Sequence, residues 1–337
     1  MNTTNAPITA TITVTPSFTN GGVTCNGTPR TFTITVNPTP TVNAVSNQVL
    51  CNGSNTTAVA FSGAVTGTVY NWTNNTTSIG LAASGTGDIA SFVATNTGTT
   101  PVIATITVTP SYTNNGVTCT GTPTSFTITV NPTPTVVQPA NQVVCNTSNT
   151  TAVTFTGAVT GTVYSWTNNT TSIGLAASGT GNIPSFVAVN NGVAPVVATI
   201  TVTPSYTNGG VTCTGTPRTF TITVNPTPTV NQPANQVVCN RSNTTAVVFT
   251  GAVTGTVYNW TNDTPSIGLA ASGTGDIAAF VAQNPTQTPV VATITVTPSY
   301  TNGGVTCTGT PRTFTITVNP TPIVVATDLF RSEEHTS

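Results

Sequence analysis

The sequence predicts an all-β fold made of tandem immunoglobulin-like β-sandwich domains with about seven strands each. A block of 94 residues recurs without insertion or deletion, as the even spacing of Cys25, Cys119, Cys213 and Cys307 shows (119 − 25, 213 − 119, 307 − 213). Within each block, short runs alternate apolar and hydroxyl side chains with a period of two, which is typical of half-buried strands. Clusters of Gly, Asn, Ser and Thr separate these runs, and none of them has a helical period.

The period divides the chain into repeats. Cutting at the recurring Asn-Pro-Thr-Pro gives complete repeats at 37–130, 131–224 and 225–318, and the C-terminal part of a truncated repeat at 1–36. Because a 94-residue unit can bury a core of its own, we expect each repeat to be a domain. The proline-rich joins between them are too short for a random coil, so neighbouring domains should form a semi-rigid rod.

Both ends of the sequence suggest a fragment of a longer protein. Aligned by the period, Met1 falls well inside a repeat, and residues 319–330 read as the start of a next repeat or a linker. Residues 331–337 break with the preceding composition and hold the only histidine and the only two glutamates. One back-translation of them reproduces the start of a common sequencing adapter, so we interpret them as non-biological.

The strand pattern is clearest at the end of each repeat. At 125–130, Phe126, Ile128 and Val130 share one face while two threonines share the other. The segment 102–109 alternates in the same way and is the expected partner, with 112–122 as the connecting loop. Earlier and shorter strands are expected in three places, at 58–61, 69–72 and 89–94.

Composition excludes several classes of function. Charged residues make up 3% of the chain and the formal net charge is −1, which gives no electrostatic attraction for nucleic acid or an anionic membrane. No apolar stretch approaches the ~18 residues of a membrane-spanning helix. The repeats contain no His, Lys or Glu, so positioned acid–base groups are lacking, and we expect no enzyme activity and no cofactor.

Three motifs of each repeat resemble a known family. "VYNWTN" at 69–74, the following "SGTGDI" and the closing "TFTITV-NPTP" are similar to the PKD-like, immunoglobulin-like repeats of large secreted or cell-surface proteins in Bacteroidetes. The resemblance implies spacers or adhesive stalks outside the cell. The chain lacks the "WDFGDG" of better-known PKD domains, because Trp72 is followed by Thr73 and Asn74.

The seven cysteines predict a disulfide framework in an oxidising, extracytoplasmic compartment. Two pairings fit the spacing: one within each repeat, and one across each linker. Because a self-contained domain should be cross-linked internally, we favour the first, in which Cys25 is unpaired. The favoured pairs are Cys51–Cys119, Cys145–Cys213 and Cys239–Cys307, and the alternative pairs are Cys25–Cys51, Cys119–Cys145 and Cys213–Cys239.

Two further sets of residues have a structural and a functional interpretation. Trp72, Trp166 and Trp260 could stack on sugars, but one tryptophan per domain beside a tyrosine favours a core aromatic residue. Asp88 and Asp276 suggest calcium, yet the middle repeat has Asn182 there and no second carboxylate is nearby. We therefore expect turn residues and no metal site.

Three functions remain in competition. The first is a non-catalytic stalk of a larger extracellular or surface-anchored protein, which connects other domains and gains avidity from weak binding to surface glycans or proteins. The second is a carbohydrate-binding accessory region of a secreted enzyme. The third is a filament subunit that assembles by strand complementation through residues 1–36.

Overall fold

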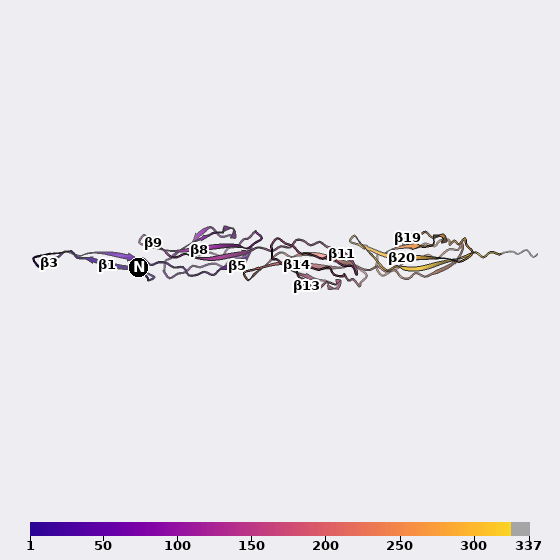
Figure 1. Cartoon of the computed structure of the whole chain (residues 1–337), viewed down its shortest axis with the longest axis horizontal. Coiled ribbons are helices and arrows are strands. Elements are labelled where there is room, and N and C mark those ends of the chain that lie inside the picture. Colours follow the sequence, from indigo (N-terminus) through magenta and orange to yellow (C-terminus); the bar gives the residue numbers. More distant parts are fainter. Residues whose placement is uncertain (325–337) are drawn as a thin grey trace, which may run out of the picture. The chain divides into compact units, whose positions relative to one another are not determined.

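The computed structural model describes residues 1–324, and its regular structure is β-strand apart from three single-turn 3-10 helices (Figure 1). This confirms the predicted all-β, tandem immunoglobulin-like fold. The chain divides into two compact units, one of residues 1–137, 155–165 and 202–218, the other of 138–154, 166–201 and from Thr219 onward. All five points at which the chain changes unit, after residues 137, 154, 165, 201 and 218, fall inside the middle repeat, so three domains divided at the repeat boundaries stay a prediction. Residues 325–337, including the segment interpreted as adapter, lie outside the described residues.

The first complete repeat shows how one sheet is built. Its strands pair in the order β5-β10-β8-β6-β7, and β9 pairs with β8. β5 runs parallel to β10, and the other pairs are antiparallel. Its elements are β5 (Gln48–Cys51), β6 (Val69–Asn74), η1 (Thr77–Ile79), β7 (Ser84–Thr86), β8 (Val102–Asn114), β9 (Val117–Thr120) and β10 (Thr124–Asn131).

The other two repeats reproduce these elements at the same period. In the last repeat the strands pair in the matching order, β17-β22-β20-β18-β19 with β21 on β20. In the middle repeat, β11 pairs in parallel with β16, and β15 pairs with the end of β14. Their bounds are β11 (Gln142–Cys145), β12 (Val163–Asn168), η2 (Thr171–Ile173), β13 (Ser178–Thr180), β14 (Val196–Asn208), β15 (Val211–Thr214), β16 (Arg218–Asn225), β17 (Gln236–Cys239), β18 (Val257–Asn262), η3 (Pro265–Ile267), β19 (Ser272–Thr274), β20 (Val290–Asn302), β21 (Val305–Thr308) and β22 (Arg312–Asn319).

The second layer of each sandwich is irregular. In the first repeat, the segments expected as strands at 58–61 and 89–94 meet only in single bridges, Val59 with Ile89 and Asn55 with Val93. Six strands therefore stand where about seven were predicted. The layer still covers the sheet, because Val59, Ile89 and their neighbours pack in one buried cluster with the sheet residues.

The alternation on β8 and β10 builds the core. Ala104, Ile106 and Val108 on β8, and Phe126 and Ile128 on β10, are almost fully buried, as the period of two predicts. Ile106 lies directly opposite Phe126 in the antiparallel register. The threonines between them face outward, where neutral hydroxyls such as that of Thr107, 3.0 Å from the Ser125 hydroxyl, take the place of charges.

The predicted loop at 112–122 is a hairpin instead. β8 continues to Asn114, and Asn114 pairs with Val117 across a two-residue turn. Asn115 and Gly116 have φ of 47° and 78°, the left-handed backbone of a tight hairpin turn. Thr113 and Thr118 then hydrogen-bond across the hairpin at 2.8 Å. The prediction was wrong because polar composition was given more weight than the Asn-Gly turn signal.

Residues 1–36 contain only the strands that correspond to the end of a repeat. They are β1 (Ile8–Val14), β2 (Ser17–Asn20), β3 (Val23–Asn26) and β4 (Arg30–Val36). β1 pairs with β4 and β2 with β3. Ile12, Phe32 and Ile34 are exposed here, whereas the corresponding residues of the next repeat are buried.

In each repeat the tryptophan ring packs over a glycine on the neighbouring strand. Trp72 on β6 lies opposite Gly85 on β7, and any Cβ at Gly85 would overlap the Trp72 ring. Trp72, Trp166 and Trp260 are 7%, 6% and 7% exposed. The Trp72 Nε1 donates to the carbonyl of Gly87 at 3.1 Å, and Trp260 does the same to Gly275. The Nε1 of Trp166 is buried without a partner.

This difference predicts unequal costs for one substitution. We expect Trp72→Phe to lower the local stability of its repeat by about 1 kcal/mol more than Trp166→Phe lowers that of the middle repeat, since only the former breaks a hydrogen bond. Hydrogen exchange read by mass spectrometry in each repeat measures this. Trp260→Phe is the control and should match Trp72→Phe; equal costs at all three positions would contradict the prediction.

Candidate functional site

The structure corrects the expected disulfide pairing. Cys51 is bonded to Cys213 and Cys145 to Cys307, each across a separation of 162 residues. Cys25, Cys119 and Cys239 are free. The expected pairs Cys51–Cys119, Cys145–Cys213 and Cys239–Cys307 are therefore wrong. The alternative pairing across the linkers between repeats is also wrong, because Cys25, Cys119 and Cys239 are free. Each disulfide joins the first cysteine of one repeat to the hairpin cysteine of the next, and each lies within one compact unit.

Strand geometry explains why the pairing within a repeat fails. Cys51 lies opposite Asn131, at the end of β10 that meets Val102 of β8. Cys119 lies opposite Tyr112, ten positions further along β8 (112 − 102). At about 3.3 Å per residue, the two cysteines are about 33 Å apart along the sheet. A disulfide requires Cα atoms within about 7 Å.

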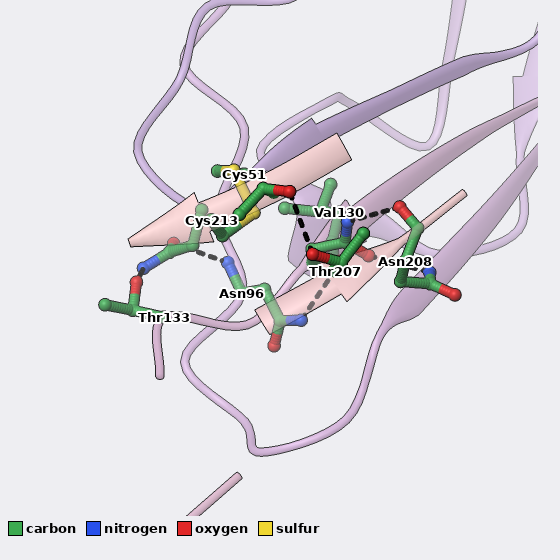
Figure 2. The surroundings of a disulfide bond; sticks show 10 residues. Cys51, Asn96, Val130, Thr133, Thr207, Asn208 and Cys213 are labelled. Atoms are coloured by element: carbon green, nitrogen blue, oxygen red, sulfur yellow. Dashed lines mark hydrogen bonds between the residues drawn. A yellow bond between two sulfur atoms is a disulfide. The ribbon is translucent and has the colours of Figure 1, made fainter. Parts of the chain in front are cut away.

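The observed partner comes from the hairpin of the following repeat. β15 packs against β5, and the Cα atoms of Cys51 and Cys213 are 5.5 Å apart (Figure 2). Cys213 is 2% exposed, so the bond is shielded from solvent on that side. In the chain-entropy model, a disulfide that closes a loop of this length stabilises the folded state by about 5 kcal/mol, because it restricts the unfolded chain. The second disulfide repeats the arrangement, with β21 against β11 and Cys307 equally buried.

A reciprocal pair of asparagines lies beside the disulfide. The Asn208 side chain at the hairpin tip donates to Asn131 Oδ1 at 2.8 Å, and Asn131 Nδ2 donates back to the Asn208 carbonyl at 3.1 Å. Asn131 is fully buried at the end of β10. Its backbone carbonyl accepts from Asn52, the neighbour of Cys51, at 2.9 Å. We call Asn131, Asn208 and the Cys51–Cys213 disulfide the clasp.

Two more asparagines hold the chain that leaves the first repeat. Asn52 Nδ2 donates to the Thr133 hydroxyl at 3.0 Å, and Asn52 Oδ1 accepts from the Asn96 amide at 2.8 Å. Asn96 Nδ2 in turn donates to the Val130 carbonyl at 2.7 Å. The side chains of Asn52 and Asn96 thereby help to fix the start of the linker relative to Cys51 (Figure 2).

A glycine lets the linker touch the hairpin. A Cβ at Gly215, just after β15, would overlap the carbonyl oxygen of Pro134 in the Asn-Pro-Thr-Pro linker. Gly121 and Gly309 stand against Pro40 and Pro228 in the same way. A side chain at this position would therefore push the hairpin off the linker.

The asparagine pair recurs at each junction in the described chain. Asn114 donates to Asn37 at 2.8 Å, and Asn302 donates to Asn225 at 2.9 Å. At the first of these junctions Cys119 is a free, half-buried thiol, so the asparagine pair forms there without a disulfide. We had not predicted these asparagines. Their recurrence in every repeat at the 94-residue period is the signal that could have found them.

Ionisable groups take little part in the site. Among residues 1–324 no cluster of three or more His, Cys, Asp or Glu could hold a metal ion. Asp88 Oδ1 accepts the Phe61 amide at 2.9 Å, and Asp276 does the same for Phe249, so both serve the backbone. Burial raises the pKa of Tyr70, and hydrogen bonds, chiefly from the Thr293 amide, lower the pKa of Asp263. Over the described residues, no helix is long and apolar enough to cross a membrane.

Comparison with known proteins finds no family match, only solved structures of low similarity. No protein-family model matches the sequence, and no curated protein matches it. Repeats EC22–24 of mouse cadherin-23 align at 14% identity over 84% of this chain and 99% of that chain, with a TM-score of 0.40. Mouse protocadherin-24 EC1–3 aligns at 16% over 85% and 100%, with a TM-score of 0.37. Immunoglobulin domains 1–5 of Sidekick-1 align at 12% over 84% and 59%, with a TM-score of 0.32.

A single tryptic digest tests the disulfide pairing. Four described arginines divide the chain after residues 30, 218, 241 and 312. Under non-reducing conditions we expect peptide 31–218 to be joined to 242–312, because Cys145 bonds Cys307. Pairing within repeats would instead join 219–241 to 242–312, and pairing across linkers would join 31–218 to 219–241.

A double-mutant cycle tests the asparagine pair. Asn131→Ala and Asn208→Ala should each destabilise the hairpin at 202–218 by about 1–3 kcal/mol. Asn208→Ala leaves the buried Asn131 side chain without its donor, and Asn131→Ala removes both hydrogen bonds to the half-buried Asn208. The double variant should cost less than their sum by about 1 kcal/mol. Hydrogen exchange of that hairpin gives the local free energies. Thr212→Ala is the matched control, because its exposed hydroxyl pair with Thr207 should contribute less than about 0.5 kcal/mol.

Proposed function

We propose that the chain is a non-catalytic spacer, the stalk region of a large secreted or surface-anchored protein of the PKD-like repeat type found in Bacteroidetes. It holds other domains of the longer chain apart. Weak contacts with surface glycans or proteins, repeated along the stalk, add avidity without any single strong site.

The observation that carries this proposal is the clasp. A spacer must limit motion between neighbouring repeats, and here the hairpin of one repeat is tied to the end of the preceding one by a disulfide and two side-chain hydrogen bonds. The same contacts recur between Cys145 and Cys307 and between Asn225 and Asn302. The two junctions between complete repeats therefore have the same contacts, as a spacer with equivalent joints requires.

Other features support a structural role outside the cell. Disulfides persist in oxidising compartments, and the two in this chain are each half buried or better. The tryptophans lie in the interior, so they offer no open ring for stacking on a sugar. This speaks against the carbohydrate-binding alternative in its simplest form.

Small-angle X-ray scattering on the oxidised chain tests the spacer. We expect a rod-like profile that is the same in millimolar calcium and in chelator, because the described residues offer no cluster of carboxylates. Binding to a glycan array should be absent or weak for the soluble chain.

Three results would contradict the spacer. A flexible-coil profile in the oxidised chain would show that the junctions do not limit motion. Tight binding of one glycan would favour the carbohydrate-binding function instead. A particle that grows with protein concentration would favour the filament subunit, in which the exposed Ile12, Phe32 and Ile34 of residues 1–36 are covered by another copy. Deleting residues 1–36 should then abolish the growth.

A further inference from the structure

The two disulfide loops overlap. One closes residues 51–213 and the other closes 145–307, so both contain the segment 145–213. Neither loop lies inside the other, and neither can be opened along its whole length without involving the shared segment. Pairs within single repeats would instead have produced loops that follow one another without overlap.

We propose that these interlocked disulfides give the chain a load-bearing function: under tension they form a redundant covalent path that limits its extension. The role in bearing load rests on the proposed spacer function. Tension that reaches Cys51 crosses to Cys213, passes back through the shared segment to Cys145, and crosses to Cys307. The chain on either side of the shared segment stays slack.

The lengths of the covalent paths follow from the positions of the four cysteines. With both disulfides intact, the shortest path from Cys51 to Cys307 contains 68 residues (213 − 145). With either disulfide broken, it contains 94 residues, because one direct stretch (145 − 51 or 307 − 213) replaces the shared segment. With both broken, all 256 residues (307 − 51) can extend.

Redundancy is the consequence. Losing one disulfide lengthens the path by only 26 residues (94 − 68), whichever bond is lost. Losing both lengthens it by 188 residues (256 − 68). The second bond therefore takes over almost the whole load when the first fails, which separate loops could not do.

The surroundings of the bonds suit this role. Cys213 and Cys307 are 2% exposed, so reductants and other thiols reach them poorly. Each sits on a strand paired to its neighbour, Cys213 opposite Tyr206 and Cys307 opposite Tyr300. The asparagine pair beside each bond, Asn131 with Asn208 and Asn225 with Asn302, holds the two cysteine-bearing segments together.

Single-molecule stretching of the full chain, held at its two ends, tests the load path. The parent variant replaces the free thiols, Cys25, Cys119 and Cys239, by serine to prevent exchange. Three variants are compared with this parent: Cys51→Ser/Cys213→Ser, Cys145→Ser/Cys307→Ser, and the variant with all four changes. Thiol titration confirms that the remaining bonds have formed. Residues outside 51–307 are common to all variants and cancel.

We expect a strongly non-additive set of contour lengths. Each two-serine variant should gain about 90 Å over the parent, and the four-serine variant about 620–680 Å, at 3.3–3.6 Å per extended residue. Reducing the parent should reproduce the four-serine length. Contour length at full extension does not depend on the folded stability of a variant, so a destabilised variant remains informative.

Additive gains would overturn the load path, as would a gain well above 90 Å in either two-serine variant. The stretching and scattering experiments together distinguish failure of the load path from failure of the spacer function. If the contour lengths add while scattering stays rod-like, the spacer stands without a load path. If they fail to add while scattering shows a coil, the interlocked path exists but the chain does not act as a spacer.

Discussion

The length of β8 determines where the two cysteines of a repeat lie, and therefore how one repeat joins the next. Its thirteen residues, Val102–Asn114, carry β10 on one half and β9 on the other. One cysteine is thereby placed at each end of the sheet, too far apart to bond. The hairpin end must then meet another repeat, and the end with Cys51 receives the next hairpin.

At the junction between repeats, hydrogen bonds between neutral side-chain amides provide the specific polar contacts that ion pairs provide in many proteins. A buried ion pair would carry a large desolvation cost, whereas the reciprocal asparagine pair satisfies the side-chain oxygen and nitrogen of the buried Asn131 with hydrogen bonds of 2.8 and 3.1 Å. Asn131 is fully buried and bonded through its side-chain oxygen, its side-chain nitrogen and its backbone carbonyl. Since no charge is involved, salt cannot screen these contacts. The low charge of the chain is thus compatible with specific joins between repeats.

The sequence predicts the sheet better than it predicts the clasp. Alternation at Phe126, Ile128 and Val130 identifies the core face, because burial on one side of a strand leaves a period of two. The hairpin at Asn115 and Gly116 could also have been predicted, because Asn-Gly is a typical sequence of a two-residue hairpin turn. The irregular layer around Val59 and Ile89 was not, since single bridges leave no periodic trace. The disulfides could not be predicted by counting, because partners that are 162 residues apart depend on where two sheet ends meet.

The position of the clasp within the repeat has an energetic consequence. The repeats 37–130 and 131–224 each place a hairpin on the preceding segment and receive the hairpin of the following repeat, so the folded state of each includes contacts made by its neighbours. Stability then resembles that of repeat proteins, a sum of intrinsic terms and nearest-neighbour terms. Here the neighbour term is large, because it contains a disulfide as well as buried hydrogen bonds. The boundary of cooperative unfolding should therefore fall inside a repeat, as the division of the middle repeat between the two compact units already does.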